Sequence, residues 1–100
     1  MTSATVSTTT DGTVVSITVR GEIDIDNAAG IEERILGAID NHATSVRVDL
    51  TDLRYMDSSG LRILFTLAAR LEVLQIRLDI IAPDGSPTRR VLDLAGFRAI

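Results

Sequence analysis

Three short segments of the chain alternate between apolar and polar residues, and this alternation restricts the possible folds more than any other feature. Successive side chains of a β-strand point to opposite faces of a sheet, so each segment predicts a strand with one apolar face. Parallel strands that are covered on both faces are instead apolar throughout. The sequence therefore predicts a sheet with helices mainly on one face. The apolar positions are Val15, Ile17 and Val19, then Val46, Val48 and Leu50, then Ile76, Leu78 and Ile80.

Apolar residues at helical spacing separate these strands. Ile31, Ile35 and Ile39 recur every four residues and predict a helix with one apolar stripe. Asp26 or Asn27 stands where this helix would begin, and both are preferred capping residues.

Two further helices are predicted. The second would begin at Ser58 as its N-cap. The third would have Ser86 as its cap, Pro87 in the first helical position and Gly96 at its end. The expected core face of the second helix is formed by Leu61, Leu64, Phe65, Ala68 and Leu71.

The first residues add another strand. Residues 2–10 are rich in threonine and serine and lead into the turn Asp11-Gly12, which predicts a hairpin with the following strand. The order of elements is then strand, strand, helix, strand, helix, strand, helix, with right-handed crossovers. We therefore expect one α/β domain over residues 1–100, with a four- to five-stranded mixed sheet whose helices lie mainly on one face, as in a βα coil.

Composition excludes several classes of function. A net charge of −4 and an aromatic content of 3% disfavour binding to nucleic acids or anionic membranes. The absence of cysteine excludes disulfides and thiolate catalysis. No apolar run has membrane-spanning length and no signal peptide is recognisable, so we expect a cytoplasmic protein. The few aromatic residues include Tyr55 and Phe97, which are expected to be partly buried.

The segment 57–60, Asp-Ser-Ser-Gly, places two hydroxyl groups where the second helix is predicted to begin. A serine at a helix start needs no function, because its side chain can cap the helix by accepting a hydrogen bond from an amide. The same hydroxyl would also be exposed at a junction between loop and helix, where a kinase can reach it. The residues alone leave both interpretations open.

A phosphate at this position would add a charge of about −1.5 to −2 beside Asp57. Amides at a helix N-terminus tolerate a phosphate, so the fold would be retained. A partner packed on the same turn would have to bury the new charge, which is unfavourable. The pattern thus fits a switch that stops binding without unfolding the domain.

Three stretches of the chain resemble the STAS-domain family of bacterial anti-sigma-factor antagonists. They are residues 19–24, 48–61 and 90–97, which follow the family's order over nearly the whole chain. The most specific is the pattern Leu-x-x-Leu-x-x-Met-Asp-Ser-Ser-Gly-Leu at residues 50–61. The fold of that family, a βα coil with helices mainly on one side, agrees with the alternation described above.

The resemblance implies a mechanism. A serine-kinase anti-sigma factor would phosphorylate Ser58, the first serine after the aspartate. The unphosphorylated form would bind that anti-sigma factor and so release the sigma factor, phosphorylation would abolish binding, and a PP2C-type phosphatase would reverse it. The resemblance also implies a monomer in isolation that needs no cofactor, metal ion or catalytic residue.

Family positions beside Ser58 imply a partner-binding surface. Asp24 matches a loop acid beside the phosphorylation turn, and Asp57 would orient the serine. Ser59 would support the helix start, and Gly60 would permit close approach of a partner backbone.

The chain departs from the family pattern at three places. Arg62 replaces a common second glycine and places a cation near Ser58, where it could pair with a phosphate or meet an acidic patch on a partner. Residues 71–75 lack the glycine that usually ends this helix. The chain also stops at Ile100, where most relatives continue, so the family's C-terminal helix is expected to be missing.

Other functions remain as alternatives. The chain could be a stand-alone STAS subunit of a transport or lipid-handling complex, although the intact segment 57–60 argues against this. A nucleophile elbow would need glycine where Met56 stands, and the lone His42 as base. Asp24, Asp26 and Asp57 could converge on a divalent cation, but such sites need several oxygens in fixed geometry.

Overall fold

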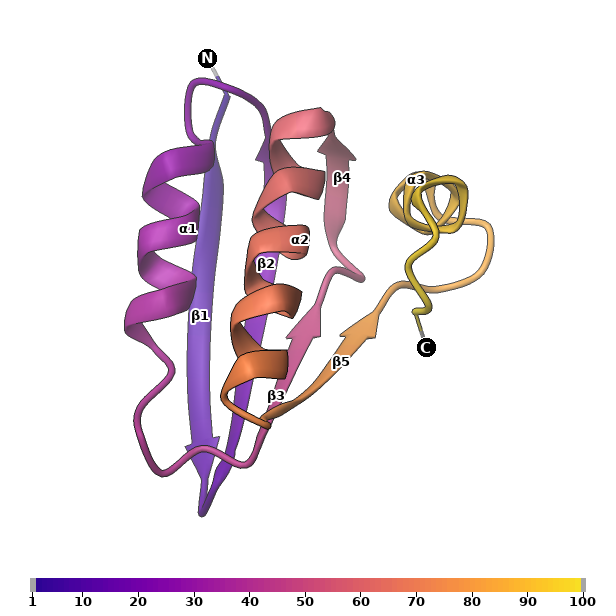
Figure 1. Ribbon diagram of the computed structural model, residues 1–100. Coiled ribbons are helices and arrows are strands. Elements are labelled where there is room, and N and C mark those ends of the chain that lie inside the picture. Colours follow the sequence, from indigo (N-terminus) through magenta and orange to yellow (C-terminus); the bar gives the residue numbers. More distant parts are fainter. Residues whose placement is uncertain (1, 100) are drawn as a thin grey trace.

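In the computed structural model, which describes residues 2–99, a five-stranded mixed sheet is combined with three helices (Figure 1). This arrangement confirms the predicted α/β class. The elements in chain order are β1 (Ala4–Asp11), β2 (Val14–Ile23), α1 (Ala28–Gly37), β3 (Ser45–Asp49), β4 (Leu53–Met56), α2 (Ser58–Val73), β5 (Arg77–Ile81) and α3 (Pro87–Ala95).

Strand β2 is the centre of the sheet. It forms the predicted hairpin with β1 and runs parallel to β3 over residues 14–18 and to β4 over residues 21–23, while β5 adds to β3 in parallel. The register shifts at Gly21, whose φ is 104°. A β-carbon there would lie 2.5 Å from the carbonyl oxygen of Ser3, so only glycine fits at this bulge.

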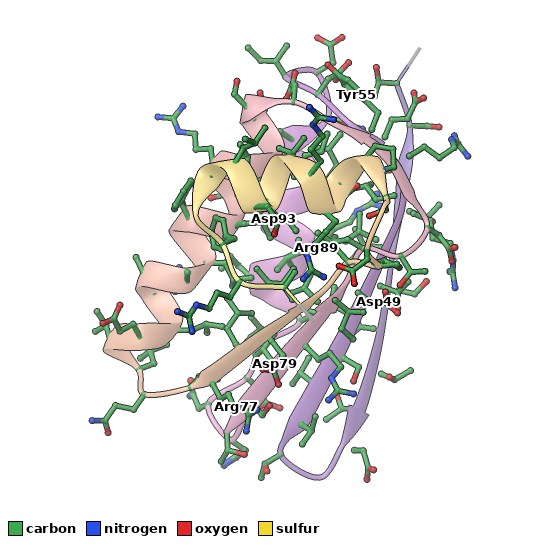
Figure 2. The ribbon with its side chains drawn as sticks, turned by 90° about the vertical axis from the view of Figure 1, so that its right-hand side faces the viewer. Asp49, Tyr55, Arg77, Asp79, Arg89 and Asp93 are labelled. Carbon is green, nitrogen blue, oxygen red and sulfur yellow. The ribbon has the colours of Figure 1, made fainter. Side chains whose placement is uncertain are left out.

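The core lies between the sheet and helices α1 and α2, which cover the same face (Figure 1). The alternating apolar residues point into it, and Val15, Ile17 and Val19 are fully buried. The opposite face carries the polar members of each strand, where Arg77 and Asp79 form an ion pair of 3.3 Å (Figure 2). The alternation therefore predicted correctly which face the helices cover.

Helix α3 packs against β4 at the edge of the sheet, after the chain leaves β5 (Figures 1 and 2). The buried Thr88 hydroxyl donates to the carbonyl of Leu53 at 3.1 Å, and the Arg89 guanidinium donates to the carbonyl of Ala82 at 2.7 Å. Leu92 is fully buried on the same helix. These contacts satisfy backbone groups at the ends of two diverging strands.

Strand β4 was not predicted, because the expected order of elements has no strand between residue 50 and the second helix. Leu53 and Met56 are buried, whereas Arg54 and Tyr55 are exposed. This burial pattern does not alternate, and four residues are too few for a local signal. Pairing with the second half of β2 makes the segment a strand.

The helical stripes also differ from expectation in detail. Helix α1 ends at Gly37, so Ile39 lies outside it. In α2 the buried face is rotated by about one residue, to Gly60, Ile63, Leu64, Leu67 and Leu71. Phe65 is 51% exposed and packs against Phe97, with 4.5 Å between ring centroids, because this side of α2 faces the chain beyond α3.

Helices α2 and α3 end in the same hydrogen-bonding motif. The amide of Ile76 donates to the carbonyl of Leu71 at 2.8 Å, and the amide of Phe97 donates to the carbonyl of Leu92 at 2.9 Å. This motif requires a left-handed residue just after the helix. In α3 that residue is the predicted Gly96 (φ 86°), but in α2 it is Gln75 (φ 58°). The glycine missing from the family pattern is thus replaced by a strained glutamine.

We expect Gln75→Gly to raise the free energy of unfolding by about 0.5–1 kcal/mol, because relief of the left-handed strain exceeds the entropy cost of glycine. Urea unfolding followed by circular dichroism measures the change. The reciprocal Gly96→Gln should lower stability by a similar amount. A glycine variant no more stable than the parent would show that Gln75 is unstrained.

Candidate functional site

Parallel pairing of β2 and β4 brings two distant acidic residues to the same end of the sheet. Ile23 is in register with Met56, so the next residues, Asp24 and Asp57, follow neighbouring strand ends. The amide of Asp57 donates to the carbonyl of Ile23 at 3.2 Å and holds the two chain segments together. Asp24 therefore lies beside the start of α2, as the resemblance implied.

The start of α2 differs from the prediction by one residue. Asp57, not Ser58, is the N-cap, and its carboxylate accepts a hydrogen bond of 2.8 Å from the amide of Ser59. Ser58 is the first helical residue and is exposed. No hydrogen bond of its hydroxyl is found within residues 2–99. The Ser58 hydroxyl is thus not used to cap the helix, whereas Ser59 supports the helix start through its amide.

Asp24 is held by a network that begins near the N-terminus. Its carboxylate accepts hydrogen bonds from the hydroxyl of Thr2 and from the amide of Asp26, the latter at 2.9 Å. The pKa of Asp24 is lowered, mainly by the Thr2 hydroxyl; desolvation opposes this, and the amides of Asp26 and Asn27 lower the pKa further. The carboxylate is therefore fixed in position and charged.

Asn27 is the N-cap of α1 but makes no capping bond with its side chain. Its side-chain oxygen instead accepts from the amide of Asp24 at 3.0 Å, and its side-chain nitrogen donates to the carbonyl of Glu22 at 2.8 Å. The predicted cap position is correct, but the side chain fixes the loop that carries Asp24.

Gly60 is buried rather than exposed. A β-carbon at this position would come within 2.7 Å of the sulfur of Met56, the last residue of β4. Glycine is therefore required at position 60 by packing inside the domain. Its bare backbone lets α2 begin directly against β4.

A groove of about 400 Å³ separates the N-terminal halves of α1 and α2. Arg62 is exposed and lines it together with Ser59. Ile25, 80% exposed, stands at the same groove, and Tyr55 is 51% exposed on β4. Figure 2 shows Tyr55 at the end of the molecule where β4 ends and α2 begins. The expectation that Tyr55 is partly buried was wrong, because its side chain is exposed. Sequence reasoning missed Ile25; an isoleucine between two aspartates, outside any apolar stripe, was the available signal.

Two alternative sites find no support in the described part of the chain. Residues 2–99 contain no cluster of three potential metal-ligating side chains, so Asp24, Asp26 and Asp57 do not form the cation site considered above. His42 lies in the loop between α1 and β3, at the opposite end of the sheet from the start of α2 (Figure 1). It cannot act as a base for Ser58.

None of the helices within residues 2–99 is long and apolar enough to cross a membrane.

Comparison with known families identifies the family of the chain. The family model described as the STAS domain matches residues 5–100. The chain belongs to the STAS-domain family.

Similar proteins share both sequence and fold with this STAS domain. The anti-sigma-F factor antagonist RsfB of Mycobacterium tuberculosis is 31% identical over 95% of this chain and 76% of its own. An anti-sigma factor antagonist from Mycobacterium paratuberculosis superposes with a TM-score of 0.79 at 29% identity, over 94% of this chain and 79% of its own. Unphosphorylated SpoIIAA superposes with a TM-score of 0.76 at 24% identity, over 92% of this chain and 81% of its own. The phosphorylated form of SpoIIAA has the same fold, with a TM-score of 0.68.

We expect Gly60→Ala to destabilise this STAS domain by about 1–3 kcal/mol, because the added methyl group overpacks against Met56. Met56→Ala removes the obstacle, so the double variant should lose less stability than the sum of the two single variants. Urea unfolding of the parent, the two single variants and the double variant gives the coupling free energy between positions 56 and 60. Additive losses would mean that Met56 is not what excludes a side chain at position 60.

Thr2→Val should raise the pKa of Asp24 toward its usual value, since the largest stabilisation of the carboxylate is removed. In the parent, the lowered pKa contributes stability above the usual carboxyl pKa, and this is lost as the pH falls through the lowered value. NMR titration of the Asp24 carboxyl carbon measures its pKa in the parent and in the variant. Ser3→Ala, whose side chain makes no hydrogen bond to Asp24, is the control; an unchanged pKa in the valine variant would contradict the assignment.

Proposed function

We propose that this STAS domain is an anti-sigma-factor antagonist that is switched off by phosphorylation of Ser58. The observation that carries the proposal is the division of roles at the start of α2. Asp57 caps the helix, which leaves Ser58 exposed and without a structural task. The names of RsfB and of the M. paratuberculosis antagonist support the same role.

Local electrostatics explain how a phosphate would act. Ser58 is the first residue of α2, so the phosphate would lie near helix N-terminal amides that favour an anion. The fold would therefore be retained. On the outer side, the phosphate would join the carboxylates of Asp24 and Asp57 in one strongly negative patch. A partner that covers this patch would have to desolvate it, which is costly without matching cations.

The proposed partner surface surrounds Ser58. Asp24 and Asp57 supply fixed carboxylates, and Arg62 supplies an exposed cation. Ser59 and Gly60 act by shaping the helix start, since the first is bonded to Asp57 and the second is buried.

Two exposed apolar side chains complete this surface. Ile25 follows Asp24 in the chain and Tyr55 lies two residues before Asp57, and exposed apolar groups ringed by polar ones are typical of binding sites. Their burial against a partner would supply affinity, while the charged groups would supply specificity and sensitivity to phosphate.

The proposed partner is a serine-kinase anti-sigma factor, which would bind the unphosphorylated domain and phosphorylate it. A PP2C-type phosphatase would restore the binding form. The protein would act in the cytoplasm as a monomer and by binding rather than by catalysis.

Incubation with ATP, magnesium and each serine-kinase anti-sigma factor of the same genome tests the proposal. Mass spectrometry should find one phosphate, on Ser58, absent from Ser58→Ala and retained in the matched control Ser59→Ala. Calorimetry should show that Ser58→Glu weakens binding at least about tenfold, since a buried unpaired charge costs more than 1.4 kcal/mol. Phosphate on another residue, or equal binding by the glutamate variant, would refute the switch.

A further inference from the structure

We propose that Arg62 is the internal counter-charge of phosphorylated Ser58, so that phosphorylation also withdraws a cation from the partner-binding surface. This inference rests on the proposed phosphorylation of Ser58 and adds a mechanism to it. The phosphate would change the surface in two ways: it adds negative charge at Ser58 and it engages the guanidinium that lines the groove between α1 and α2.

The spacing of the two residues supports pairing. Ser58 and Arg62 are four residues apart in a continuous helix that extends to Val73, and both are exposed. Side chains at this spacing are neighbours on a helix surface, with β-carbons about 5–6 Å apart. The anion stands N-terminal to the cation, which is the more favourable order. A guanidinium can also bind two phosphate oxygens at once.

Arg62 is available for this role. No ion pair or hydrogen bond of its side chain is found within residues 2–99. Arg89 on α3, by contrast, contacts Asp84, Asp93 and the carbonyl of Ala82. The next cation of α2 is Arg70, twelve residues after Ser58 and therefore about 18 Å along the axis.

The carboxylates near Ser58 do not hold Arg62. Asp57 bonds the amide of Ser59, and Asp24 bonds Thr2 and Asp26. Glu32 lines the opposite side of the groove without an ion pair to Arg62. In the unphosphorylated domain, Arg62 can thus meet an acidic group of a partner. A dianionic phosphate four residues away would compete with that acid inside the same molecule.

Phosphoserine incorporated directly at position 58 during synthesis tests the pairing without any kinase. Phosphorus NMR then follows the second ionisation of the phosphate in the isolated domain. Arg62→Gln should raise the phosphate pKa by about 0.3 or more, because pairing favours the dianion. Arg62→Lys should restore most of the difference, and Arg70→Gln should cause none. The carboxylates of Asp24, Glu32 and Asp57 face the site equally in all variants, so they cancel in the comparison.

An identical phosphate pKa in the parent and in Arg62→Gln would overturn the inference, and so would an equal effect of Arg70→Gln. Neither result depends on a kinase or an anti-sigma factor. Failure of the proposed function would instead appear as the absence of phosphate on Ser58 in the kinase experiment. The two proposals therefore fail separately.

Discussion

The geometry of the candidate switch depends on the pairing of β2 with two successive parallel strands. The first half of β2 pairs with β3, and its last residues pair with β4 after the bulge at Gly21. The amide of Gly21 also donates to the carbonyl of Asp52, in the connection between β3 and β4. Because β4 ends beside the end of β2, helix α2 begins next to the loop that carries Asp24. Without this shared strand, the two acidic residues and Ser58 would not lie together.

Around the start of α2, the groups that hold the structure are separate from the groups that are free to react. The buried Gly60 packs on Met56, the amide of Asp57 is bonded to Ile23, and the Asp57 carboxylate caps the helix. Ser58 takes part in none of these contacts. A charge can therefore be added to its hydroxyl without disturbing what positions it, which is the physical requirement for a switch that acts on binding alone.

Three features of the structure show the limits of local preference. The sequence predicts Ser58 as the cap, but aspartate caps a helix equally well, and local preference cannot choose between adjacent candidates. The core face of α2 was rotated because Phe65 is apolar, yet it packs at the margin against Phe97. Gln75 occupies a left-handed position that local preference assigns to glycine. In each case, local preference alone does not select the observed arrangement.

The sequence by itself determined the strands with alternating faces, the third helix with its Ser86 cap and Gly96 end, and the motif at residues 50–61. These features follow from local periodicity and local hydrogen bonding, which a short window of residues contains. Only the tertiary structure decided that residues 53–56 form a strand, that Gly60 is buried against Met56 and that Thr2 bonds Asp24. Each of these features depends on segments that are brought together by pairing with β2 or packing on it. A local sequence pattern cannot predict which distant segments will meet.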